Sequence, residues 1–448
     1  MTTLSSPRRR TAGITRQLAL ALALAGCTAV LAIPGFTDAA HAQRKKKEDK
    51  KESPKAPYSK EFVAGYQPLD AAMKVPGADV AVIKPQILAL VPLAISPEEK
   101  QALGGMTFNA GIIGKDPVLQ LQGVEMMLES GKLPPEELGR YNLVAFQVAG
   151  SVKQNDKARG FLQRAIDLNY AAENITTSDL QMNMAELYFS EDRNVEGLKY
   201  LSDAIAVRKA AGQPIDARWY RRGVSVAYTN EIVPQVYEFV TDWVIDNPTA
   251  ENWRDAVNLT RNLNDFEPAV LLDLLRLGKR VGALKEKNDY IYYIDAADAR
   301  RLPMEVKQII EDARANGVIP KGSDTFVDEQ MGIASSRIAA DRGDLPALER
   351  DANAASVQLR TVVAAGDAFL SYGEFAKAAG FYEKSLNLPG ADRNLVLTRL
   401  GIAQIGLGNA AAARESLMQV DGVRMPVARL WSAYAAQQQQ SAAQATGD

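Results

Sequence analysis

The sequence predicts an all-α protein, an α-solenoid of stacked antiparallel helix pairs. Residues 366–386 alternate small and large side chains as two hairpinned helices require, and residues 401–420 repeat this pattern about 35 residues later. Helix-start signals recur along the chain. Only residues 80–83 suit a short strand, which Pro85 would end, and residues 86–90 suit a buried helix better.

The first 42 residues have the pattern of a secretory signal. Four arginines precede an apolar run from Leu18 to Phe36, and an A-x-A cleavage site follows at residues 40–42. Two alternatives stay open: residues 24–27 match a bacterial lipobox in which Cys27 would be lipidated, or the run of about 19 apolar residues remains as an uncleaved anchor. We expect an exported, periplasmic protein, with a membrane-anchored one as the alternative. No later segment is as apolar, so no membrane span is expected in the mature chain.

Residues 43–57 are predicted to be a basic disordered linker, because residues 43–55 carry seven basic and three acidic groups and few apolar ones. Such a segment suits attraction to anionic lipid or cell-wall polymer. The chain has 52 basic and 54 acidic residues, and beyond residue 55 there remain 41 and 50, a net charge of −9. An acidic body argues against a nucleic-acid partner.

The first clear helix start is at Ser96-Pro97, where Glu99 can close a capping box. Further helix starts are expected at Asp116-Pro117, residues 134–137, Ser178 with Gln181, and residues 302–305. Turns inside the helix pairs are expected near Gly114, Asn155, Asn194, Ile232, Asp265, Leu302, Gly343, Gly373 and Gly408.

These signals divide the chain into five parts: a signal peptide (1–42), the linker (43–57), an N-terminal and middle helical array (58–316), C-terminal repeats with a capping helix (325–436) and a disordered polar tail (437–448). Residues 317–324 would be the hinge between the two arrays. We expect an open spiral whose concavity is the working surface.

Within residues 366–386, Gly366, Ala378 and Ser385 are expected where the two helices approach most closely. The large side chains that would fill the remaining groove are Phe369, Phe375, Tyr382 and Leu386. Gly373 would take the left-handed conformation at the turn, at little steric cost. Gly401, Gly408 and Ala413 hold the matching positions of the next repeat.

This pattern resembles the tetratricopeptide repeat family, closely over residues 357–421 and more loosely over 134–250. The resemblance implies a right-handed superhelix that binds a protein or peptide segment in its groove. It does not identify the partner or the oligomeric state.

The candidate binding site is residues 218–228. Trp219, Tyr220, Gly223, Val224, Val226 and Ala227 are expected on the buried side of a helix, and Trp243 and Trp253 in the same core. Arg218, Arg221, Arg222 and Ser225 fall at i, i+3, i+4 and i+7 and form one polar stripe, with Tyr228 beside it.

Two interpretations of this stripe stay open. Some members of the family hold a peptide's terminal carboxylate with basic residues and asparagines, and Arg218 and Arg222 match basic positions of that site. Three other positions differ from that carboxylate-binding site: Leu143 replaces a lysine, and Gln147 and Glu186 replace asparagines. Alternatively, the arginines pair with acidic neighbours on the surface.

Chemistry is restricted because the sole cysteine, Cys27, and the sole histidine, His41, both lie in the predicted signal. A mature chain without them has no Ser-His-Asp or Cys-His mechanism and no thiolate or imidazole metal site, and we expect no metal, cofactor or catalysis. Carboxylate-pair hydrolysis would remain, but Asp295, Asp298 and Glu305 are expected on solvated helix surfaces.

The sequence therefore favours a non-catalytic scaffold or adaptor of the bacterial cell envelope that binds a protein or peptide. The alternatives are a carboxylate-dependent cell-wall glycosidase on a helical scaffold and a membrane-tethered envelope assembly factor.

Overall fold

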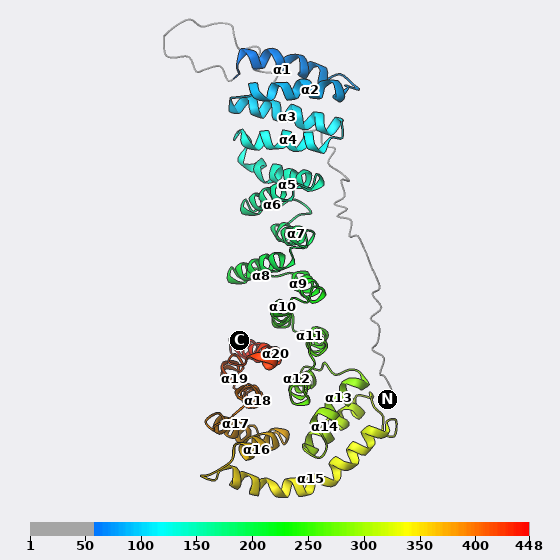
Figure 1. Ribbon diagram of the computed structural model, residues 1–448, viewed down its shortest axis with the longest axis vertical. Helices are drawn as coiled ribbons and strands as arrows, with labels where there is room; N and C mark the ends of the chain where they lie inside the picture. Colours follow the sequence, from blue (N-terminus) through cyan, green and yellow to red (C-terminus); the bar gives the residue numbers. More distant parts are fainter. Residues whose placement is uncertain (1–57, 448) are drawn as a thin grey trace, which may run out of the picture. The chain divides into compact units, whose positions relative to one another are not determined.

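The computed structural model describes residues 58–447, which contain twenty α-helices, two short 3₁₀ helices and no β-strand (Figure 1). The prediction of an all-α helical solenoid is confirmed. The predicted signal peptide, with Cys27, and the basic linker lie outside the described residues. None of the described helices is both long enough and apolar enough to cross a bilayer.

The first ten helices are α1 (Lys60–Met73), α2 (Val80–Leu90), α3 (Pro97–Ile113), α4 (Pro117–Glu129), α5 (Pro135–Ser151), α6 (Asn155–Asp167), α7 (Thr177–Phe189), α8 (Asn194–Ala210), α9 (Ala217–Thr229) and α10 (Val233–Asp246). The next ten are α11 (Ala250–Asn262), α12 (Pro268–Arg280), α13 (Lys287–Ala297), α14 (Pro303–Ala315), α15 (Thr325–Ala352), α16 (Leu359–Ser371), α17 (Phe375–Leu386), α18 (Arg393–Gly406), α19 (Ala410–Leu417) and α20 (Met425–Gly447). The 3₁₀ helices are η1 (Val91–Leu93) and η2 (Gly422–Arg424).

The predicted helix starts hold with one exception. At the start of α3 the Glu99 carboxylate accepts a hydrogen bond from the Ser96 N–H at 2.8 Å, while the Ser96 hydroxyl accepts one from the Glu99 N–H at 3.1 Å. The start predicted at Ser178 is wrong: Thr176 caps α7, and its N–H donates to Asp179 at 2.9 Å. Thr176 is the N-cap because Asp179 completes a capping box with it, whereas Gln181 completes none with Ser178.

Residues 80–83 belong to α2 and do not form the short strand that the sequence allows. Pro85 lies inside this helix. Asp79 caps the helix by accepting from the Ala81 N–H at 3.0 Å, and Val80, Ile83 and Ile87 pack in the core. The helical spacing of the buried residues therefore determines the structure of this segment, although its β-branched residues would favour a strand.

The turn predicted at Gly343 is wrong, whereas the other predicted turn positions lie at helix ends or between helices. Gly343 and Pro346 lie inside the 28-residue helix α15. Val327 and Ala334, in the first half of α15, belong to a hydrophobic cluster with α12–α14. Residues in its second half belong to the cluster with α16–α20. The helix continues because both of its halves are anchored by burial.

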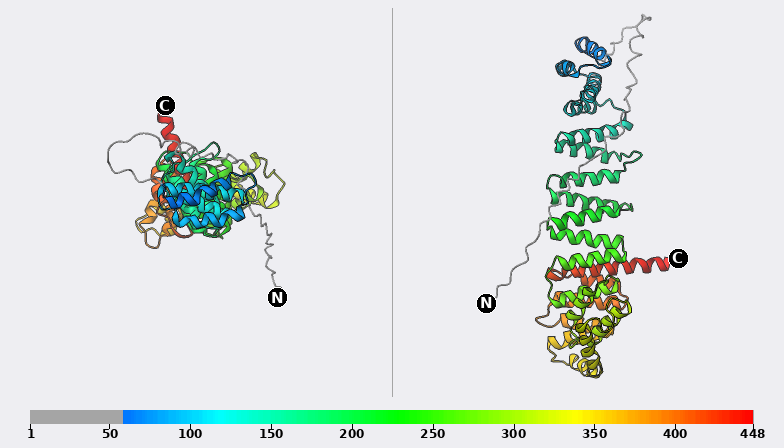
Figure 2. Two further views of the ribbon diagram at one scale, coloured as in Figure 1. Left: turned by 90° about the horizontal axis from the view of Figure 1, so that it is seen from above. Right: turned by 90° about the vertical axis from the view of Figure 1, so that its right-hand side faces the viewer.

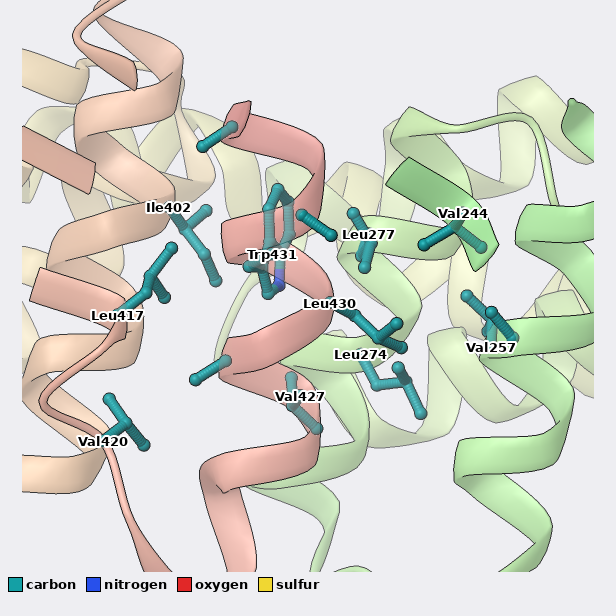
Figure 3. Close-up of a cluster of buried hydrophobic side chains, with 14 of the residues drawn as sticks. Val244, Val257, Leu274, Leu277, Ile402, Leu417, Val420, Val427, Leu430 and Trp431 are labelled. Atoms are coloured by element: carbon teal, nitrogen blue, oxygen red, sulfur yellow. The ribbon is translucent and has the colours of Figure 1, made fainter. Parts of the chain in front are cut away.

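Most helices pack against their neighbours in sequence, but the C-terminal part also folds back onto the middle of the stack (Figure 1). Helix α20 contacts α10 and α12 as well as α19. Figure 3 shows Leu430 and Trp431 of α20 between Leu274 of α12 and Ile402 of α18. The predicted open spiral is therefore closed along α10–α20, and the arrays separated in sequence at residues 317–324 share one core.

Helix α12 lies at the centre of this closure. Residues 272–278 are all buried, as expected for a helix that has packing partners on every side. Helix α20 covers α12 and continues to Gly447 (Figure 2), past residue 436, where the sequence predicts a disordered tail.

The glycines of the C-terminal repeats lie at close helix contacts and turns. A Cβ atom on Gly366 would lie 2.6 Å from the Tyr382 ring, and one on Gly401 would lie 2.5 Å from Leu417. Gly373 and Gly408 have φ of 75° and 76°. Phe369, Ala378, Tyr382 and Ala413 are buried.

Gly366→Ala should lower the free energy of unfolding by about 1–3 kcal/mol, because the new methyl group would overlap the Tyr382 ring. The control is Gly380→Ala on α17, an exposed helical position where a Cβ meets nothing within 4 Å. That change should raise the free energy by about 0.5–1 kcal/mol through helix propensity. Urea denaturation followed by circular dichroism measures both, and equal shifts for the two variants would contradict the packing described here.

Candidate functional site

The predicted arginine stripe lies on α9. The helix is capped by Asp216, whose carboxylate accepts a hydrogen bond from the Arg218 N–H at 2.8 Å. Its buried residues are the six that the sequence places on the buried side: Trp219, Tyr220, Gly223, Val224, Val226 and Ala227. Trp243 and Trp253 lie in the same core cluster. The stripe therefore faces outward from α9.

Arg222 is paired with an acidic residue of the neighbouring repeat. Its guanidinium donates two hydrogen bonds to the Glu186 carboxylate of α7, at 2.6 and 2.7 Å. It also lies 5.2 Å from the centre of the Phe189 ring. This bidentate pair fixes Arg222 against α7.

Arg218 is more exposed but also has an acidic partner. Its guanidinium contacts the Asp216 carboxylate at 2.6 Å and Asp179 of α7 at 3.7 Å. The hydrogen bond from Arg218 holds the pKa of Asp216 below its usual range. Because the Arg218 side chain is 73% exposed, the pair is screened by solvent and contributes little to stability.

Arg221 differs from its two neighbours in the stripe. It is exposed and lies 6.0 Å from the centre of the Trp243 ring of α10, and it forms no ion pair with any residue between 58 and 447. Ser225 is exposed, and Tyr228 is 44% exposed. Arg221 is therefore the member of the stripe without a direct ion pair among the described residues, although its charge helps to lower the pKa of Asp216.

The residues that depart from the family's carboxylate-binding pattern also have defined positions. Leu143 is buried in α5, Gln147 is exposed on the same helix, and Glu186 occupies the guanidinium of Arg222. A peptide's terminal carboxylate would have to displace Glu186 from Arg222. The geometry favours recognition of acidic side chains at Arg221 and Arg218 over capture of a terminal carboxylate.

Helix α9 lies on the side of the stack away from α20. In Figure 1 the first helices of successive pairs, α7, α9 and α11, lie on one side, and α8, α10 and α12 lie on the other. Among the helices of the middle repeats, α20 packs mainly against α10 and α12, and its Tyr434 lies edge-on to Trp253 of α11 at 6.2 Å between ring centres. The arginine stripe of α9 stays exposed.

A second polar cluster, centred on Asp273 of α12, is buried in the closure. The Asp273 carboxylate accepts hydrogen bonds from Arg276 at 2.8 Å, Arg399 at 3.3 Å and Arg424 at 2.8 Å. The Trp431 indole donates to the main-chain oxygen of Asp273 at 2.8 Å. One residue, Asp273, therefore joins α12 to α18 and η2 through its carboxylate and to α20 through its main-chain oxygen.

The cluster extends to both sides of α12. Arg276 donates to both carboxylate oxygens of Glu305, at 2.8 and 2.7 Å, and the Tyr293 hydroxyl donates to the same carboxylate at 2.9 Å. Arg399 donates to Asp367 of α16 at 2.6 and 2.7 Å. We refer to Asp273, Arg276, Glu305, Asp367, Arg399 and Arg424 as the closure network.

Glu305 is buried, so its predicted place on a solvated surface is wrong. Asp295 and Asp298 are exposed, as expected. No local pattern marks Asp273 or Glu305 as buried ions, because Asp273 is 126 residues from Arg399 and 151 from Arg424. The sequence signal is a pair of opposite charges, Asp273 and Arg276, three residues apart in the otherwise apolar stretch 269–278.

Two carboxylates of the closure network, those of Asp273 and Glu305, have a lowered pKa. Burial alone would raise the pKa of Asp273, but Arg399, Arg276 and Arg424 outweigh it and hold this pKa below its usual range. Burial opposes ionisation of Glu305 as well, and Arg276 likewise lowers its pKa. The carboxylates of Asp273 and Glu305 are both engaged in ion pairs with guanidinium groups, so these two residues have a structural role. Within residues 58–447 no group of three acidic, histidine or cysteine side chains is placed to hold a metal ion.

Comparison with models of known protein families finds no match, and no curated protein sequence matches the chain significantly. The tetratricopeptide resemblance therefore stays a prediction from the residues that carry it.

Asp273→Asn should lower the free energy of unfolding by about 3–5 kcal/mol, because it leaves the buried Arg424 without its counter-charge and removes one of the two carboxylates that pair with each of Arg276 and Arg399. Urea denaturation measures this change. Asp295→Asn, an exposed change on α13, is the control and should shift the midpoint little. A midpoint for Asp273→Asn equal to that of the control would show that the network contributes nothing.

The stability of the protein should fall as the solution is acidified. The closure-network carboxylates Asp273 and Glu305 have lowered pKa values in the folded protein. Their stabilisation is therefore complete above the unfolded pKa of about 4 and is lost as the pH falls through the lower folded values. Urea midpoints measured between pH 7 and pH 3 should drop steeply below about pH 4, and less steeply in Asp273→Asn. An unchanged slope in that variant would contradict the assignment.

Proposed function

We propose that the protein is a non-catalytic scaffold or adaptor of the bacterial cell envelope that binds a protein or peptide segment along the first helices of its middle repeats. The observation that carries this proposal is the exposed arginine stripe of α9, on a side of the stack that the protein's own C-terminal helix leaves uncovered.

The chemistry of the stripe supports a partner segment with acidic side chains. Arg221 forms no ion pair among the described residues, and Arg218 pairs only with solvent-exposed carboxylates. Guanidinium groups suit bidentate binding of carboxylates. Tyr228 adds an exposed aromatic side chain next to the stripe, a residue type enriched in protein interfaces.

The buried carboxylates favour this function over the glycosidase alternative. In residues 58–447 these are Glu99, Asp273, Asp289 and Glu305. Glu99 and Asp289 accept hydrogen bonds from helix-start N–H groups, and the other two belong to the closure network. A glycosidase needs two carboxyl groups on either side of a substrate, whereas these four serve capping and ion pairing.

The predicted signal at residues 1–42 supports export to the periplasm, where such a scaffold would meet envelope proteins. Retention at the membrane, through Cys27 or an uncleaved signal, is the second candidate location. The sequence pattern around Cys27 carries that alternative.

The double variant Arg218→Ala, Arg221→Ala should weaken binding of the partner more than tenfold, because loss of a central arginine contact typically costs about 2 kcal/mol or more. A photo-crosslinking residue at Ser225 first identifies the partner in intact cells, and titration of the purified pair then measures the dissociation constant. Both arginines are exposed, so the fold should remain intact.

The matched control is Arg337→Ala, Arg360→Ala, which removes two exposed arginines on α15 and α16. It should bind as the wild type does. If the partner binds both double variants equally well, or if crosslinks from Ser225 persist in the Arg218, Arg221 variant, the stripe is not the binding site.

A further inference from the structure

The N-terminal end of the described chain has a mainly apolar helix face that no other described element covers. Helix α2 buries Val80, Ile83, Ile87 and Leu90 on one side. On the opposite side of α2 and along η1 the exposed residues are Ala81, Val82, Pro85, Gln86, Leu88, Ala89, Pro92 and Leu93, followed by Ile95. We call the eight apolar ones the α2 face.

One polar side chain, Gln86, lies among the residues of the α2 face, and its amide donates a hydrogen bond to the Val82 carbonyl at 3.2 Å. The eight residues of the face itself carry no charge and no polar side chain. Val82 is 60% exposed, Leu88 36%, Leu93 39% and Ile95 80%. The nearest charge on the helix, Lys84, lies at the flank and pairs with Asp116 of α4. Contiguous exposed apolar patches mark interaction surfaces.

The charge distribution along the chain indicates what covers this face. Residues 43–55, directly before the body, have a net charge of +4, whereas the chain beyond them has a net charge of −9. An anionic surface would attract the N-terminal flank and repel the rest. The end of the chain that approaches such a surface is therefore the end that carries α1 and α2.

We propose that the α2 face is a membrane-docking surface that inserts into the interface of an anionic phospholipid bilayer. An apolar helix face partitions into the boundary between headgroups and acyl chains, and basic residues nearby add attraction to anionic lipids. At 11 residues, α2 is too short to span a bilayer and would lie in its plane. This docking is independent of the arginine stripe on α9 and does not depend on the proposed function.

Docking orients the stack. The α2 face is at the N-terminal end of the array, so α5–α12 follow it along the chain away from the site of insertion. The protein would then present its middle repeats from a membrane surface without a membrane-spanning segment in the described part.

The test compares two triple variants of the protein purified from the cells that export it. Leu88→Gln, Leu93→Gln, Ile95→Gln makes the α2 face polar. Val195→Gln, Val207→Gln, Met418→Gln changes three exposed apolar residues elsewhere. Binding is measured by co-sedimentation with vesicles of phosphatidylglycerol and phosphatidylcholine, and with vesicles of phosphatidylcholine alone.

The wild type and the control variant should bind the anionic vesicles with the same affinity and the neutral vesicles more weakly. The α2-face variant should bind the anionic vesicles at least tenfold more weakly. A polarity-sensitive fluorophore on Ala89→Cys should shift to the blue when these vesicles are added, and one on Met418→Cys should not.

Three results would overturn the proposal: no binding of the wild type to anionic vesicles, equal binding of the two triple variants, or no shift of the fluorophore at residue 89. Light scattering tests the alternative that a second copy of the chain binds the α2 face. If the wild type is a dimer and the α2-face variant a monomer with unchanged vesicle binding, the face binds a second copy of the chain and membrane docking is wrong.

Discussion

The closed half of this protein depends on one carboxylate. Asp273 lies on a helix that is buried on every side, and it accepts hydrogen bonds from three arginines that belong to α12, α18 and η2. Hydrophobic burial brings α12 and α20 together, but it is not directional. The closure network supplies direction, since the guanidinium of Arg399 meets Asp273 and Asp367 in a single arrangement of α12, α16 and α18.

The cost of burying these charges is offset only while all partners are present. Burial opposes ionisation of Asp273 and Glu305, and the surrounding guanidiniums overcome it. A stack in which each pair touches only its neighbours can open at any interface. In this protein α12 and α20, the first and last helices of the segment α12–α20, pack against each other. We therefore infer that this segment unfolds as one unit.

Local features of the fold were predictable from the sequence, and long-range ones were not. The six buried residues of α9 follow from helical periodicity within 11 residues, and Gly366 and Gly373 follow from the spacing of small residues in a hairpin. The contact of Asp273 with Arg399 has no such local cause. The partner of Arg222 was foreseeable as an acidic neighbour, but that it is Glu186, and that Arg221 has none, depends on how α7 and α9 pack.

The single helix α15 has a consequence for how this chain can vary. Its two ends are anchored in different hydrophobic clusters, so one inserted residue in its middle would rotate everything that follows by about 100° and shift it by about 1.5 Å. Arg399 would then miss Asp273. Whole helix pairs can be gained or lost among α1–α9 without such an effect. In contrast, α15 tolerates no change of length, because its length determines where the two distant parts of the chain that it connects meet.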